Sequence, residues 1–212
     1  MTAATTDRIR LRDIVHAGFK GLPDMPIVLR GLWNLATVKP ATALSIGLVI
    51  ERHAAATPHA TALVFEGRQW TYHAFNAWAN RIAASLAEAG VKAGDSVAIL
   101  MENRAETLAC VAAVVKLGAA AGMLNHQQRG EVLSHSIGLI APKVIIVGSE
   151  CAEALASTPW QPGGEQGALY FWDGSKAAPK GYTDLVKDSA KRSEKNPPST
   201  VAVEARETCF YV

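Results

Sequence analysis

The alternation of short apolar runs with helix-like segments, from about residue 45 onward, restricts the fold more than any other feature of this sequence. Residues 96–101 (SVAILM) and 143–147 (KVIIV) are almost continuously apolar, as expected for strands that are buried on both faces. Between 71 and 90, apolar side chains such as Phe75 and Ile82 recur at helical spacing instead. Strands separated by helices predict right-handed βαβ units, and therefore an α/β fold with a mostly parallel sheet and flanking helices.

The same patterns place the individual elements along the chain. Helices are expected at 45–57, 71–90, 103–118, 129–140 and 151–157, and strands at 62–65, 69–72, 96–101, 119–124, 143–147 and 168–172. Thr71 is the predicted N-cap of one helix, and Asn103, three residues before Glu106, that of another. Two polar segments fall outside the alternation: 161–166 reads as a turn and 191–200 as a solvated loop.

Composition excludes several classes of protein. The chain is 49% hydrophobic and 19% charged, which is typical of a soluble globular protein with a real core. The net charge is only +2, and the sequence has no basic stripe with interleaved aromatic residues, so nucleic acid is not an expected partner. Three widely spaced cysteines and no secretory signal indicate reduced thiols in a cytosolic protein rather than disulfides or a zinc site.

The first 44 residues are predicted to form a separate basic, amphipathic segment. Residues 1–40 hold six basic against three acidic side chains, so the basic excess of the whole chain lies there. Within 25–47, a short helix with Trp33 and Arg30 could rest on an anionic membrane surface. The alternative, a helix packed on the following domain, is favoured because the apolar face is short and bounded by Pro26 and Pro40.

Sequence motifs for nucleotide or metal chemistry are missing. Neither GxGxxG after a strand nor GxxxxGK[ST] occurs, which argues against a nicotinamide-dependent oxidoreductase and a Walker-type ATPase. The histidines have no partners at ligand spacing, and no serine has the context of a hydrolase nucleophile. Glu102, Glu106 and Glu131 are interpreted as helix-terminus residues rather than as a catalytic pair.

The stretch AGMLNHQQRGEVLSHSIG, residues 121–138, is the most informative for a ligand site. A strand ends at Leu124 and a polar loop follows, and ligands of open α/β sheets gather at the carboxyl ends of strands. Asn125 and Arg129 are therefore placed to face a site. A second interpretation is that Asn125 and Gln127 cap the next helix while Arg129 pairs with a nearby acid, and the pattern alone leaves both open.

The string MENRAETLACVAAVVKLGAAAGMLNHQQRGEVLSHSI resembles the AMP-forming acyl-CoA synthetases of the acyl-adenylate-forming superfamily, nearest the long-chain and very-long-chain branch that includes fatty acid transport proteins. ALVFEGRQWTYHAFNAWANRIAASLAEAGVKAGDSVAIL and KVIIVGSE support the resemblance, which covers about 46–212. It implies the N-terminal part of the large domain of such an enzyme, which uses ATP, CoA and Mg²⁺ to convert fatty acids to acyl-AMP and then to thioesters.

The resemblance carries over few functional residues. Asn125, His126 and Arg129 are expected beside the acyl or CoA channel, and no catalytic, cofactor-binding or metal-binding residue is assigned. The terminal ETCFYV is similar to the strand that leads into the family's phosphate loop. Residues 45–212 are therefore expected to be an incomplete AMP-binding domain that is inactive alone and binds ATP, CoA and Mg²⁺ at most weakly.

The expected partner is a long-chain fatty acid, and the expected location is the cytoplasm. Peripheral contact with the inner face of the membrane through the N-terminal segment is the alternative to a helix packed on the domain. A function from another class is a non-catalytic acyl-binding or interaction module that reuses this half-domain. The apolar terminal strand at 209–212 argues against the module, because an unpaired apolar edge favours aggregation.

Overall fold

The computed structural model describes residues 25–212, and these fall into two compact units on either side of the Pro40–Ala41 junction. The first contains helix α2 (Met25–Thr37). Residues 42–44 already belong to the second unit, because Ala43 forms a bridge with Glu204 and the Leu44 amide donates to the Val203 carbonyl. The unit boundary therefore lies a few residues before the position expected from sequence.

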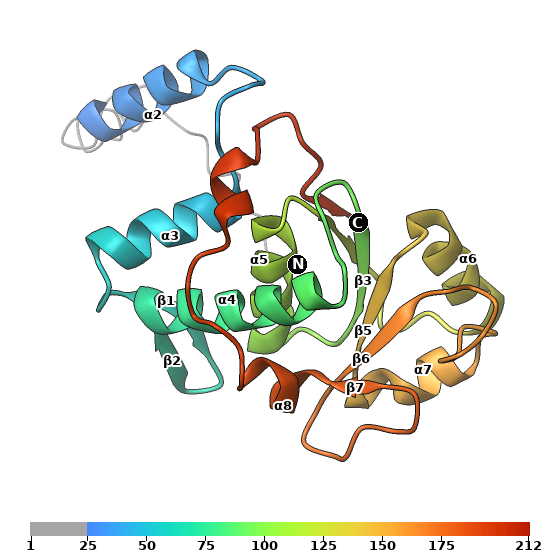
Figure 1. Ribbon diagram of the computed structural model, residues 1–212. Helices are drawn as coiled ribbons and strands as arrows, with labels where there is room; N and C mark the ends of the chain where they lie inside the picture. The colour runs from blue at the N-terminus through green and yellow to red at the C-terminus, as the bar shows by residue number, and fades with distance from the viewer. Residues whose placement is uncertain (1–24) are drawn as a thin grey trace, which may run out of the picture. The chain divides into compact units, whose positions relative to one another are not determined.

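A parallel sheet of six strands forms the centre of the second unit (Figure 1). Every neighbouring pair in it is parallel, and β3 lies between β4 and β5. The spatial order is β7 (Thr183–Asp184), β6 (Leu169–Asp173), β5 (Val144–Gly148), β3 (Ser96–Leu100), β4 (Ala120–Met123) and β8 (Phe210–Tyr211). The predicted parallel α/β fold is confirmed.

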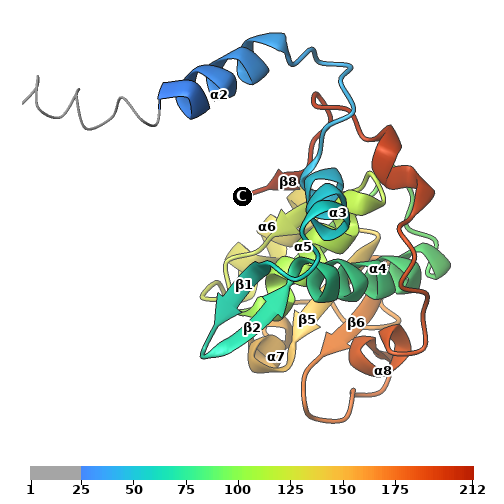
Figure 2. The same cartoon turned by 90° about the vertical axis from the view of Figure 1, so that its left-hand side faces the viewer.

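Helices cover both faces of this sheet (Figures 1 and 2). On one face Val97 and Ile99 of β3 pack with α4 (Tyr72–Glu88), α5 (Ala105–Lys116) and α8 (Leu185–Ser189). On the other, Ala98 and Leu100 pack with α6 (Gly130–Ile140) and α7 (Ala152–Ala156). Alternate strand residues thus enter different cores, which explains the continuous apolar runs, and each large side chain buried contributes about 1.5–3 kcal/mol.

The elements before β3 also follow their sequence signals. Strands β1 (Thr61–Phe65) and β2 (Arg68–Thr71) form the predicted hairpin, whose turn residues Glu66 and Gly67 both have positive φ. Thr71 is the N-cap of α4, and its hydroxyl accepts a hydrogen bond from the Ala74 amide at 3.2 Å. Helix α3 (Ile46–Ala56) is capped in the same way by Ser45.

One predicted helix cap is wrong. The N-cap of α5 is Arg104 rather than Asn103, and it makes no side-chain capping bond. Its guanidinium instead reaches the ends of two other strands, as described below. The Thr107 hydroxyl donates to the Glu102 carbonyl at 2.8 Å, which ties the loop after β3 to the first turn of the helix.

Residues 191–204, here called the strap, pack on the domain more closely than a solvated loop would. Pro198–Ala202 is a 3-10 helix, and the Ser199 hydroxyl donates to the Lys116 carbonyl at 2.7 Å. The side-chain amide of buried Asn80 in α4 donates to the Glu194 carbonyl at 2.7 Å and to Asn196 at 2.8 Å. The strap therefore connects α4 with α5 before the chain enters β8 (Figure 1).

Among residues 25–212, no helix has both the length and the apolar character needed to cross a membrane.

Candidate functional site at the carboxyl edge of the sheet

All six strands run in the same direction, so their carboxyl ends meet at one edge of the sheet, where open α/β sheets bind ligands. Two cavities open there. The first, called the β4–β8 cavity, has a volume of about 380 Å³ and is lined by Met123, Leu124, Asn125, Gln128, Ser136, Leu139, Ile140, Tyr211 and Val212. The second, called the Arg81 cavity, has a volume of about 700 Å³ and borders the ends of β5 and β6.

Asn125 lies where the sequence predicts, directly after β4, and it lines the β4–β8 cavity. Its side-chain oxygen accepts a hydrogen bond from the Gln127 amide at 2.9 Å, which closes a tight turn in the loop. The alternative in which Asn125 and Gln127 cap the following helix is wrong, because the N-cap of α6 is Arg129 and it has no side-chain capping bond.

Arg129 stabilises the loop by hydrogen bonds to its backbone and does not form an ion pair with a described residue. Its guanidinium donates from Nη1 to the carbonyls of His126 and Gln128, at 2.6 and 2.7 Å. Within the described part of the chain no acid lies in salt-bridge contact with it, so the expected pairing with a local acid is wrong. Of the three residues carried over from sequence, Asn125 lines the cavity, whereas His126 and Arg129 belong to the loop behind it.

Gln128 and Tyr211 also line this cavity, although the sequence did not single them out as site residues. The side-chain oxygen of Gln128 is buried without a hydrogen-bond partner among residues 25–212, and Tyr211 forms the wall opposite α6. A buried amide oxygen without a partner is costly, so this position favours a donor from a ligand or water. Gln128 carries no sequence signal of its own, because its burial depends on how the loop turns back toward α6.

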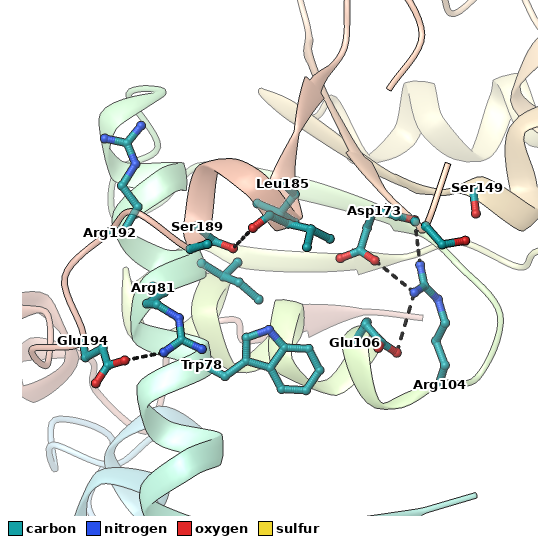
Figure 3. Close-up of a pocket in the computed structure, with 15 residues that line it drawn as sticks. Trp78, Arg81, Arg104, Glu106, Ser149, Asp173, Leu185, Ser189, Arg192 and Glu194 are labelled. Atoms are coloured by element: carbon teal, nitrogen blue, oxygen red, sulfur yellow. Dashed lines mark hydrogen bonds and ion pairs between the residues drawn. The ribbon is translucent and has the colours of Figure 1, made fainter. Parts of the chain in front are cut away.

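Arg104 joins three strand ends beside the Arg81 cavity (Figure 3). Its guanidinium contacts Asp173 at the end of β6, with Nη1–Oδ1 at 2.9 Å, and Glu150 after β5, with Nε–Oε1 at 3.1 Å. Glu106 in the first turn of α5 is 3.6 Å away. Glu106 is thus at a helix terminus, as expected, while the sequence analysis missed Arg104 and Asp173.

Burial and charge shift the pKa values of this group. Burial raises the pKa of Asp173, whose side chain is 6% exposed, and the Arg104 charge only partly opposes it while Glu106 and Glu150 add to it. Burial alone would lower the pKa of Arg104, but the charges of Asp173 and Glu150 outweigh it and the pKa is raised. Arg104 is therefore a permanent cation that holds carboxylates from three segments together.

Metal and thiol chemistry find no support in the described residues. Between residues 25 and 212, no group of three or more histidine, cysteine, aspartate or glutamate side chains could hold a metal ion. Cys110 and Cys151 are buried, and burial raises the pKa of both thiols, that of Cys151 to about 11. Both are therefore packing residues rather than nucleophiles.

A parallel sheet covered on both faces, with polar loops and cavities at its carboxyl edge, defines a ligand-binding α/β domain. The model of one family, described as "AMP-binding enzyme", matches residues 50–210, and the chain belongs to this family. The resemblance drawn from the sequence motifs is thus confirmed.

Relatives from bacteria and mammals agree with this assignment. The chain is 37% identical to the medium/long-chain-fatty-acid–CoA ligase FadD6 of Mycobacterium tuberculosis over 96% of the chain's length. It is 30% identical to mouse long-chain fatty acid transport protein 6 over 76% of the chain's length. A solved Mycobacterium tuberculosis fatty acyl-CoA synthetase superimposes on 78% of the chain with a TM-score of 0.67 and 26% identity. The chain spans 32%, 26% and 31% of these three proteins, about a third of their length or less.

Proposed function

We propose that this chain forms the first part of the AMP-binding domain of a medium- or long-chain fatty acid–CoA ligase. The identity of 37% to FadD6 across nearly the whole chain carries the proposal. In this reaction a fatty carboxylate attacks the α-phosphate of ATP and releases pyrophosphate, and the CoA thiol then displaces AMP from the acyl-AMP. AMP makes a good leaving group, so the two steps turn an unreactive carboxylate into a thioester.

The β4–β8 cavity is the proposed contribution of this chain to the acyl or CoA channel. Its walls are mainly apolar, with Leu139, Ile140 and Tyr211, and the side chains of Asn125, Gln128 and Ser136 add a few polar groups. An apolar wall with a few orienting polar groups suits an alkyl or pantetheine chain. In this proposal Asn125 contacts the substrate, while His126 and Arg129 fix the shape of the loop through the hydrogen bonds of Arg129.

ATP, CoA and Mg²⁺ belong, in this proposal, to the complete enzyme. The described residues do not fit a Mg²⁺ site, so no step is assigned to the metal here. The chain holds no Gly-rich phosphate motif either, and it spans about a third of FadD6. We therefore expect the 212 residues alone to show no ligase activity and to bind these cofactors weakly at most.

An exchange experiment tests the function directly. The matching third of FadD6 is replaced by this chain, and palmitoyl-CoA formation is measured with ATP and CoA. The chimera should keep fatty-acid-dependent activity, and Asn125→Ala in it should lower the rate more than Gln127→Ala, which alters an exposed side chain outside the cavity. A soluble chimera that activates no fatty acid would contradict the proposal.

A second assay examines the isolated chain. ATP–pyrophosphate exchange with palmitate should not exceed a no-enzyme control. Palmitate binding separates the alternative function: a folded chain that binds palmitate by itself favours a stand-alone acyl-binding module, and a folded chain that does not bind it favours one part of a larger domain.

We also propose that the N-terminal segment contacts the inner face of the membrane, with the protein in the cytoplasm. Helix α2 has no buried residue, and its side chains Leu29, Leu32 and Trp33 are all exposed. With about 3.6 residues per turn, these share one side of the helix with Val28 and Leu35, while the opposite side carries polar Arg30, Asn34 and Thr37. A helix of this kind can lie in the membrane interface with Trp33 at its edge.

Vesicle sedimentation tests this contact. The full chain should sediment with vesicles that contain phosphatidylglycerol, and a version that begins at Ala43 should not. Trp33→Ser should weaken the binding, while Val132→Ser, which alters an exposed apolar side chain of α6 on the domain, should not. Equal sedimentation of both chains would remove the membrane contact and favour a helix packed on the domain.

A further inference from the structure

The Arg81 cavity is the largest described here, and the proposed ligase function does not use it. Its volume of about 700 Å³ lies in the range of small-molecule sites. It is bordered by α4, α8, the strap and the loops after β3, β5 and β6 (Figure 3). This places it on the helix-α4 face of the sheet, whereas the β4–β8 cavity is lined by α6 on the other face.

One side of the cavity is an apolar wall. Trp78 and Ile82 of α4 lie opposite Leu185 and Val186 of α8. The Trp78 ring is fixed by Trp70, which stacks with it at 5.9 Å between ring centroids, and in Figure 3 it lies between Arg81 and Arg104. A rigid indole beside aliphatic side chains favours a flat apolar body.

Helix α4 also presents one guanidinium with unused hydrogen-bond donors, that of Arg81. Arg104 and Arg192 each engage at least two carboxylates. Arg81 has a single partner within residues 25–212, Glu194 of the strap, with Nη1–Oε1 at 2.5 Å. A guanidinium has five N–H donors and binds carboxylates in pairs of bonds, so Arg81 retains most of its capacity.

The charges that line the cavity favour a ligand with a single negative charge. The three cations there, Arg81, Arg104 and Arg192, are balanced by three carboxylates, those of Glu106, Asp173 and Glu194, so displacing the Glu194 side chain leaves one positive charge for the ligand. The carboxylate of Glu194 already occupies the position in front of Arg81, although its side chain is 58% exposed. A partner this exposed contributes little stability and is easily replaced.

We propose that the Arg81 cavity binds a small organic monocarboxylate with a flat apolar body. The ligand carboxylate takes the place of Glu194 on Arg81, and its body lies against Trp78. The strap backbone need not move, because the Glu194 carbonyl stays bonded to Asn80 while the Glu194 side chain turns outward to solvent.

Calorimetric titration of the full chain with 2-naphthoate tests the proposal, without ATP or CoA, so that it is independent of ligase activity. Naphthoate should bind, whereas the neutral 2-naphthalenemethanol, inorganic phosphate and octanoate should each bind at least about tenfold more weakly. If the alcohol bound as tightly as naphthoate, the ligand charge would have no role. If octanoate bound as tightly, the cavity would not require a flat ligand. Absence of naphthoate binding would overturn the proposal as a whole.

Variants identify the residues. Arg81→Gln should weaken naphthoate binding about tenfold or more, Arg81→Lys should weaken it less, and Glu194→Gln should strengthen it severalfold. Arg206→Gln is the matched control, because it removes another arginine–glutamate pair of the surface, that with Glu204. Thermal melts check that each variant is folded, and unchanged binding by folded Arg81→Gln would contradict the proposal.

Discussion

At the residue scale, the pair formed by Lys116 and Glu51 is the most unusual feature. The Lys116 side chain is fully buried, yet its ammonium lies 2.6 Å from the Glu51 carboxylate and so joins α5 to α3. Burial lowers the pKa of Lys116, and the hydrogen bond and charge of Glu51 oppose this only in part. The folded chain therefore releases this proton more readily than the unfolded chain, and its stability rises with pH between the two pKa values.

Glu51→Gln should destabilise the protein by about 3 kcal/mol, because it leaves a buried cation without its counter-charge. The double change Glu51→Leu with Lys116→Met should restore most of this free energy of unfolding, since it removes both charges. Urea denaturation measures both. The pair formed by Lys187, whose side chain is 73% exposed, with Asp184 is the control, and Lys187→Met should have little effect. A double variant no more stable than Glu51→Gln would contradict this account.

Asp95 responds to pH in the opposite sense. Burial alone would raise its pKa, but the Lys92 amide at 2.8 Å and the Lys143 ammonium at 3.0 Å outweigh burial, and the pKa is lowered. Its ionised form therefore adds stability above the unfolded pKa of about 3.9, and this is lost as the pH falls through the folded value. Asp95→Asn should lower the urea midpoint at pH 7 and lower it less at pH 3. An equal shift at both would rule out this linkage.

At the scale of elements, Arg104 at the N-terminus of α5 connects the ends of strands β5 and β6 through its ion pairs with Glu150 and Asp173. Removing it leaves Asp173 buried and unpaired, so Arg104→Gln should cost about 2 kcal/mol of unfolding free energy. Asp173→Asn added to Arg104→Gln should recover part of that loss. A double-mutant cycle from chemical denaturation measures the coupling, and strictly additive effects would show that the pair contributes nothing of its own.

The sequence predicts the long elements well for the same physical reason that makes them stable. Strands β3 and β5 are buried on both faces, which requires uninterrupted apolar residues. By contrast β7 and α8, which have two and five residues, are too short for any periodicity. They depend on the Asp184 cap and on burial of Leu185, neither of which a local pattern reveals.

The same limit explains which site residues were found. Asn125 could be predicted because a polar residue after a strand lies at the carboxyl edge whatever the rest of the fold does. Arg104 and Asp173 are 69 positions apart, and only the order of strands in the sheet brings them together. The Arg81 cavity likewise requires the strap to lie beside α4, which the polar composition of 191–200 does not indicate.

At the scale of the whole molecule, the β8 edge is the surface where a second chain could pair. Phe210 and Tyr211 are each 47% exposed, and β8 has a described neighbour only in β4. Unprotected edges of this kind associate with other strands. Tyr211→Lys should therefore reduce concentration-dependent association in sedimentation velocity, whereas Val201→Lys, at a 60% exposed position of the strap, should not. Equal association of both variants would place the contact elsewhere.

The pairing of β8 with β4 also determines how long one edge of β4 stays unpaired during synthesis. Ala121 of β4 is opposite Phe210, so the β4 edge has no partner until the ribosome has added the intervening chain. At about 5–20 residues per second, that wait is roughly 5–18 s, far longer than local helices need to form. During this interval β4 presents an open edge to every neighbour, so a chaperone would be most useful to the nascent protein just after β4 emerges.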